Sequence, residues 1–172
     1  PGLMIDLVQV IPGKEYGVMH RQNRSENEVV VVVKPWSNEK KPVLKEQYRK
    51  AIEDYIEPYR LINTKVTVES ARYAGICVHG KIALEQDSPK TSKAVLDRIS
   101  RELSYTERKH PFGTVISYGQ LFTALENTEG VKKVLELNLE RTGNAARKND
   151  RGDVLLDADA LGILEGTDLE FC

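Results

Sequence analysis

Apolar and polar residues alternate along several short stretches of the chain, and this alternation predicts β-strands with one packed side and one solvated side. Residues 29–33 are instead five consecutive valines, a run typical of a strand that is covered on both faces and central in its sheet. Together these patterns predict strands over residues 3–11, 29–33, 65–69, 76–85, 131–139 and 161–171.

Three segments have the spacing of helices. Residues 42–57 carry an apolar stripe at intervals of three and four, with Pro42 in the first turn and Pro58 beyond the end. A second helix begins at Ser88, and a shorter third one opens with the capping-box pattern of Ser117 and Gln120. The predicted buried side chains of the first two are Leu44, Tyr48, Ala51, Ile52, Tyr55 and Ile56, and Val95, Leu96, Ile99 and Leu103.

The order of these elements predicts an α+β fold, a two-layer sandwich with a ferredoxin-like βαββαβ core and extra terminal strands. We expect residues 1–26 to form an N-terminal strand and a connecting loop, and residues 27–140 to form the sandwich core. Residues 141–172 are expected to add a charged, mobile loop over 141–152 and a C-terminal strand that packs on the same domain.

Length and composition narrow the function classes. A chain of 172 residues with 40% hydrophobic residues can bury a core without disulfides, and its two cysteines, Cys77 and Cys172, are expected to be free thiols. A formal charge of -1 gives no net attraction to nucleic acid or anionic lipid, and no apolar run is long enough to span a bilayer. Because the chain starts at Pro1 without a methionine, we expect it to be a piece of a longer polypeptide.

Two groups of residues resemble metal ligands without completing a site. Cys77 and His79 project from one face of a predicted strand, but a zinc site needs three or four ligands. Asp153, Asp157 and Asp159 lie beside Gly152, yet their spacing does not fit an EF-hand loop, so we interpret them as turn and cap residues. No cofactor or metal is therefore predicted.

Two further features suggest chemistry or binding. His110, in the sequence HPFG, could act as a general base in a small hydrolase, although no partner with the spacing of a triad accompanies it. Arg141, Arg147, Lys148 and Arg151 form a local excess of positive charge that could bind RNA, as some ferredoxin-like sheets do, or dock on an acidic protein. The chain lacks the aromatic run of such RNA-binding strands.

Trp36 follows the valine run in a polar setting, KPWSNEKK. Tryptophan is enriched at the centres of protein interfaces, and it also caps the ends of sheets. We therefore carry Trp36 forward, together with the four basic residues, as candidate interface residues.

An ordered series of segments resembles the C-terminal part of the baseplate J-like family of contractile phage tails and related injection machines. The resemblance covers nearly the whole chain and depends on the order and spacing of GLMIDLVQVIPG, NEVVVVVKP, PVLKEQYRKAIEDYIEPYRLINTKVTV, YAGICVHGKIAL, PFGTVISYGQLFTALENTEGVKKVLELNL and GDVLLDADALGIL.

The resemblance implies a structural wedge subunit without a catalytic site, present in several copies and holding other wedge and hub proteins. It also implies assembly in the cytoplasm of a bacterial host, followed by residence in a tail baseplate or a phage-like injection particle. Our prediction is thus a protein-protein interaction module and not an enzyme. The alternatives are the His110 hydrolase and the RNA-binding domain.

Overall fold

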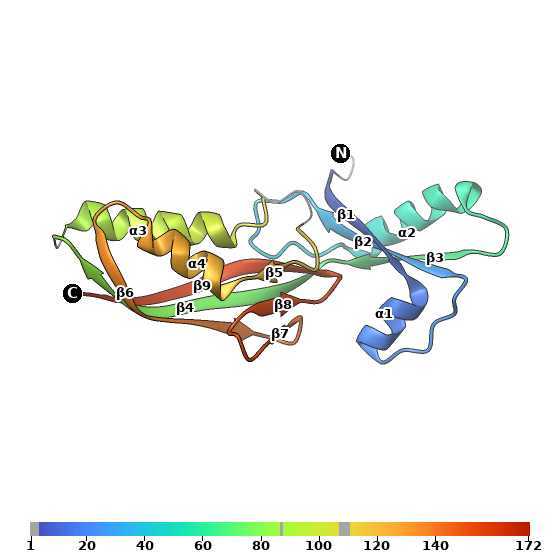
Figure 1. The fold of residues 1–172 in the computed structure, drawn as a ribbon. Coiled ribbons are helices and arrows are strands. Elements are labelled where there is room, and N and C mark those ends of the chain that lie inside the picture. The colour runs from blue at the N-terminus through green and yellow to red at the C-terminus, as the bar shows by residue number, and fades with distance from the viewer. Residues whose placement is uncertain (1–3, 87, 107–110) are drawn as a thin grey trace. The chain divides into compact units, whose positions relative to one another are not determined.

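The computed structural model describes residues 4–86, 88–106 and 111–172 (Figure 1). Its chain divides into two compact units, an N-terminal unit, Pro1–Arg72, and a C-terminal unit, Tyr73–Cys172. The elements in order are β1 (Ile5–Pro12), α1 (Gly13–His20), β2 (Glu28–Pro35), α2 (Glu46–Ile56), the 3-10 helix η1 (Glu57–Tyr59), β3 (Lys65–Ser70), β4 (Arg72–Leu84), α3 (Pro89–Leu103), β5 (Val115–Ile116), α4 (Tyr118–Glu126), β6 (Val131–Thr142), β7 (Ala146–Lys148), β8 (Val154–Leu156) and β9 (Ala160–Phe171).

The N-terminal unit contains a sheet of order β1-β2-β3, with the valine strand in the centre as its sequence predicts. β2 runs antiparallel to β1 and parallel to β3, and α2 forms the crossover that a parallel pair needs. On the α2 side of the sheet, Val33, Leu44 and Val68 form a buried cluster, against which Tyr48, Ile52 and Ile56 pack.

The connecting loop that we expected after the first strand, within residues 1–26, is wrong in part, because residues 13–20 form α1. The amphipathic signal is weak, since Tyr16 is the one large side chain of this helix that is buried. Gly13 allows the helix to start against β2: a Cβ atom there would lie 2.6 Å from the Glu28 carbonyl oxygen. The helix ends at Arg21, in the left-handed region at φ 55°.

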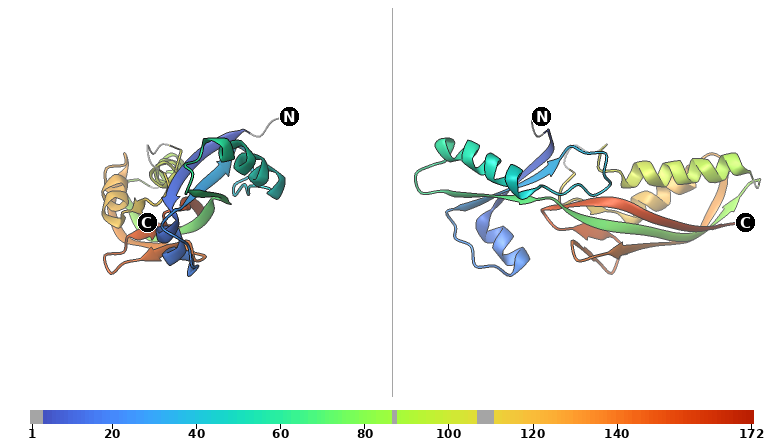
Figure 2. Two further views of the ribbon diagram at one scale, coloured as in Figure 1. Left: turned by 90° about the vertical axis from the view of Figure 1, so that its right-hand side faces the viewer. Right: turned by 180° about the vertical axis from the view of Figure 1, so that it is seen from behind.

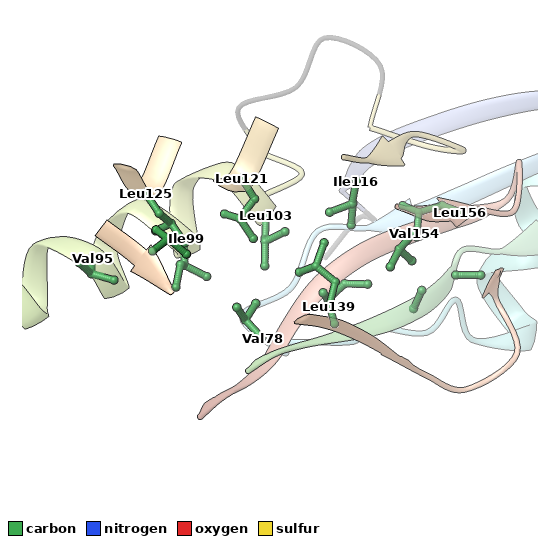
Figure 3. Close-up of a cluster of buried hydrophobic side chains, with 14 of the residues drawn as sticks. Val78, Val95, Ile99, Leu103, Ile116, Leu121, Leu125, Leu139, Val154 and Leu156 are labelled. Atoms are coloured by element: carbon green, nitrogen blue, oxygen red, sulfur yellow. The ribbon is translucent and has the colours of Figure 1, made fainter. Parts of the chain in front are cut away.

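The C-terminal unit has a sheet of order β6-β4-β9, with α3 and α4 over one face (Figure 2). β4 is antiparallel to β6. It runs parallel to β9, because the Cys172 N–H donates to the Ile82 oxygen while the Leu84 N–H donates to the Cys172 oxygen. Figure 3 shows the core that the helices and strands enclose, including Val78, Ile99 and Leu139.

Several predicted features of this unit are confirmed. Ile76, Val78, Ile82 and Leu84 are buried on one face of β4, as their alternation predicts. The Ser117 hydroxyl accepts a hydrogen bond from the Gln120 N–H at the start of α4. The helical stripe of α3 is right at Val95, Ile99 and Leu103, which are buried, but Leu96 is 39% exposed.

The predicted mobile loop over residues 141–152 is also wrong in part. It includes β7, which pairs with β8, and β8 pairs in turn with β5 to form a third sheet. Ala145 and Ala146 are 2% and 3% exposed, so two small side chains anchor a segment whose other residues are charged or polar.

The α+β class is confirmed, with four helices and three small sheets among the described residues. The ferredoxin-like arrangement needs correction, because β2 and β3 belong to one sheet and β4 and β6 to another. A hairpin turn takes at least two residues, whereas only Ala71 separates β3 from β4, so β4 cannot fold back onto β3. The division at Arg72 falls inside the range 27–140 that we expected to form one core.

Candidate interaction surfaces

Trp36 lies just after β2, where its backbone N–H donates a hydrogen bond to the Met4 carbonyl oxygen at 2.8 Å. Its side chain is 56% exposed and lines a hollow of about 330 Å³ in the N-terminal unit. Met4 and Val43, 64% and 66% exposed, line the same hollow, and Leu44 and Tyr48 connect it to the cluster beneath α2. Apolar and polar atoms line this hollow in nearly equal parts, around the one tryptophan of the chain.

The apolar face under α2 continues beyond the helix onto β1, an edge strand of this sheet. Val8 and Val10 lie opposite Val33 and Val31, and opposite residues of an antiparallel pair point to the same face. Val8 and Val10 are nevertheless 50% and 58% exposed, because α2 packs mainly against β3.

The other edge of the same sheet is closed by side chains. The Glu53 carboxylate of α2 accepts a hydrogen bond from the Val68 N–H of β3 at 3.0 Å. The Ser70 hydroxyl accepts one from the Leu44 N–H, also at 3.0 Å. The Val68 N–H on this edge is thus occupied by a side chain, whereas β1 is the edge strand on the opposite side of the sheet.

A second exposed apolar group follows α2. Tyr55 and Tyr59 are 71% and 76% exposed, with ring centroids 5.8 Å apart, and Leu61 and Ile62 follow at 77% and 93%. Arg60 shapes this turn by donating to the Glu57 carboxylate and to nearby carbonyl oxygens. The hydrogen bond from Arg60 lowers the pKa of Glu57.

An ion cluster fixes the segment between α1 and β2. Arg24 donates to Glu28 at 2.6 Å, to Thr67 at 2.8 Å and to Glu69 at 3.2 Å, and its guanidinium carbon lies 4.9 Å from the centroid of the Tyr16 ring. The side chains of Arg24 and Glu28 are only 13% and 7% exposed. These contacts join α1, β2 and β3, which gives the cluster a structural role.

The four basic candidates all lie in the C-terminal unit, and their surroundings differ. Lys148 donates to Asn138 at 2.7 Å, and Arg141 donates to the Gly143 oxygen. Arg147 is exposed on β7, and Arg151 lies in the turn before Asp153. Trp36 belongs to the other unit, so the predicted interface residues do not form one site within either unit.

The residues that resembled metal ligands have other contacts. Asp153 accepts hydrogen bonds from the Asn149 side chain at 3.0 Å and from the Tyr118 N–H at 2.9 Å, and these two bonds lower the pKa of its carboxyl group. It therefore caps the start of α4 as our turn-and-cap interpretation predicts. Cys77 is a free thiol. Among the described residues no three His, Cys, Asp or Glu side chains are arranged to hold a metal ion.

The exposed face of β4 is charged. His79 lies 3.6 Å from both Glu140 and Asp168, and Lys81 donates to Glu170 at 2.7 Å. An open hollow of about 570 Å³, lined mainly by polar groups, is bordered by His79, Lys81, Asp168 and Glu170. His110, the proposed base of the hydrolase alternative, lies outside the described residues.

Comparison with solved structures finds proteins of similar fold. The chain is similar in fold to a chain of the cryo-EM structure of the anti-feeding prophage (AFP) baseplate, 6-fold symmetrised, with a TM-score of 0.59 and 13% sequence identity. The match covers 82% of this chain and 29% of the baseplate chain, so our sequence spans less than a third of that protein's length. No protein-family profile and no curated protein sequence matches the chain.

Sequence reasoning found Trp36 but missed the surface around it. The alternation of residues 3–11 identified a strand with one apolar side, yet it does not reveal whether α2 covers that side. The exposed pair Leu61 and Ile62 was visible as two apolar residues in a turn, a setting in which neither belongs to a helical or strand stripe. No helix among the described residues is long and apolar enough to cross a membrane.

Proposed function

We propose that this chain is part of a structural subunit of a contractile, phage tail-like baseplate, and that it belongs with the baseplate J-like wedge proteins. The observation that carries the proposal is the fold match to a chain of the anti-feeding prophage baseplate over 82% of the present sequence. The ordered sequence segments that resemble the baseplate J-like family support the same assignment independently of the coordinates.

The distribution of exposed apolar side chains also supports a role in assembly. Of the fourteen large hydrophobic residues that are exposed in the described part of the chain, eleven lie in the N-terminal unit, and they include Trp36, Val8, Val10, Leu61 and Ile62. Apolar surface of this kind marks sites of protein-protein contact. A scaffold subunit needs such contacts, whereas an enzyme needs a pocket with positioned ionisable groups.

In this proposal the partners are other wedge and hub proteins, and the chain is present in several copies around the tail axis. Each stable contact would bury about 1,200–2,000 Å² in total, and repetition around a ring allows single contacts to be weaker. Trp36, Arg141, Arg147, Lys148 and Arg151 are proposed as contact residues. Assembly takes place in the bacterial cytoplasm, and the finished particle carries the subunit in its baseplate.

The decisive experiment is deletion of the gene in the bacterium that encodes it, followed by electron microscopy of induced particles. We expect free tubes or no particles, and restoration of sheathed particles when the gene is supplied in trans. Intact contractile particles in the deletion strain would overturn the proposal. Sheath, tube, spike and wedge genes beside the coding sequence would strengthen it.

A non-catalytic role is part of the same proposal, and His110 provides its test. A broad hydrolase screen of the purified protein and of His110→Ala should give no turnover for either. Turnover that disappears with His110→Ala would contradict the proposal and favour the hydrolase alternative.

A further inference from the structure

The two edges of the N-terminal sheet have different chemistry, and this difference suggests what binds to one of them. On β3 the Val68 N–H is occupied by the Glu53 carboxylate, which blocks an incoming strand. Among residues 4–86, 88–106 and 111–172, β1 has a neighbouring strand only on its β2 side, and its exposed valines, Val8 and Val10, carry no charge that would repel a partner.

We propose that β1 is a docking edge for an extended segment of another protein, which adds to the sheet as an antiparallel fourth strand. Backbone N–H and C=O groups on the outer side of an edge strand give such a segment its affinity, and side-chain pockets give it its specificity. This inference rests on the proposed function only because a structural subunit needs docking sites, and its test is separate.

The shape of the surface defines the side chains of the partner. Residues 48, 52 and 56 of α2 pack on the sheet, while Arg49 and Glu53 contact β3. By helical geometry, Gln47, Ala51 and Tyr55 therefore lie on the flank toward β1. All three are exposed, as are Val8 and Val10 on the same side of the sheet, so an added strand with alternating, medium-sized apolar side chains would cover apolar surface there.

The charge near the start of β1 indicates which residues the C-terminal end of the partner segment should carry. Beyond the start of β1, the hollow around Trp36 is bordered by Lys45 and Glu39. Lys40 and Lys41 belong to the same connecting segment and are exposed, which makes this end positive. An antiparallel strand ends here, so its C-terminal residues are expected to be acidic.

The area explains why we propose a segment and not a globular face. A standard interface takes about 20–30 residues from each partner, whereas β1 has eight residues. Main-chain hydrogen bonds add affinity that does not depend on this area. A short tail or loop is therefore the occupant that fits.

The probe is a synthetic peptide of alternating valine and threonine, as long as β1 and ending in two glutamates. Trp36 is the only tryptophan of the chain, so its fluorescence reports binding at the hollow directly. We expect saturable binding and slowed exchange of β1 amide hydrogens. The same peptide ending in two lysines should bind more weakly. The difference in affinity between the two peptides should shrink as the salt concentration is raised, because salt screens the charges.

Two matched sets of controls distinguish strand addition from non-specific binding. Val8→Lys with Val10→Lys should weaken binding by about tenfold or more, because charges on an edge oppose pairing and two apolar contacts are lost. Val18→Lys, at a site 79% exposed on α1, should leave it unchanged. Circular dichroism should show the same fold for all variants.

Peptides with N-methyl groups on one or the other alternate set of residues test the backbone directly. One of the two sets should lose binding, because its N–H groups face β1. Equal binding of both methylated peptides, no binding up to millimolar peptide, or unchanged exchange of the β1 amides would each overturn the proposal. The proposal would also be overturned if the chain forms a dimer that Val8→Lys abolishes, because a second copy of the chain would then occupy the β1 edge.

Discussion

The two units use their apolar residues differently. Among the residues that the structure describes, the C-terminal unit has only Leu96, Val115 and Leu135 as exposed large hydrophobics, and α3 and α4 enclose a continuous core on the sheet. The described residues of the N-terminal unit include eleven such side chains, and the Arg24 ion cluster joins α1 to the sheet of this unit. The comparison indicates that the C-terminal unit buries most of its large apolar side chains in its own core, whereas the N-terminal unit leaves many of them exposed.

The core of the C-terminal unit should respond most strongly to mutation. Ile99 is fully buried in the middle of α3, and Ile99→Ala should lower the free energy of unfolding by about 4 kcal/mol, since it leaves a cavity. Leu96→Ala, on the same helix but 39% exposed, should cost less than about 1 kcal/mol. Urea unfolding measures both, and equal losses would mean that α3 does not pack as described.

The ion cluster of the N-terminal unit comes next. Arg24→Met should cost about 3 kcal/mol, because it leaves the buried Glu28 carboxylate without its closest cation. Lys14→Met removes an ion pair of the same 2.6 Å length to Glu26, but both side chains are more than two-thirds exposed, so its cost should stay below about 1 kcal/mol. Thermal unfolding of the two variants provides the measurement. Similar losses would show that burial does not distinguish the two pairs.

A smaller effect is expected where two strands of the C-terminal sheet approach closely. A Cβ atom at Gly80 would lie 2.5 Å from the Glu136 carbonyl oxygen, so Gly80→Ala should cost about 2 kcal/mol through displacement of β6. Gly119→Ala, in α4, meets only the Ser117 hydroxyl at 3.9 Å and should be neutral or slightly stabilising. If calorimetry gives both variants the same melting temperature, the strands are further apart than described.

Near Gly80 the sequence pattern and the structure diverge. Leu135, Leu137 and Leu139 alternate as a strand should, and β6 is indeed a strand, but Leu135 is 47% exposed while Leu139 is buried. Lys81 lies opposite Glu136 and Ile82 opposite Val134, so Leu135 is an extra residue on β6. Such a bulge reverses the inward face without changing the alternation, and alternation alone therefore predicts the strand but not its buried side.

The sequence predicted the elements of the fold better than it predicted the candidate interaction surfaces. The type of each long element followed from local periodicity, and Trp36 stood out because an aromatic residue in a polar segment has few other roles. The difference between the β1 and β3 edges did not follow from the sequence, because it depends on the strand order β1-β2-β3, on α2 packing toward β3 and on Glu53 bonding to Val68 of β3. Assignment of β3 and β4 to separate sheets also depended on the single residue between them.

The smallest expected effect concerns the acid response of the C-terminal unit at Asp153. Its folded-state pKa is lowered by the Asn149 side chain and the Tyr118 N–H, so its stabilising contribution is present above the unfolded-state pKa of about 3.9 and is lost as pH falls through the lower folded value. NMR titration should therefore place the Asp153 midpoint below the usual range, and Asn149→Ala should move it upward. Leu139→Ala, a core change on the same unit, should lower stability at every pH without moving that midpoint. If Asn149→Ala leaves the titration midpoint of Asp153 unchanged, the hydrogen bonds of the turn before β8 are not arranged as described.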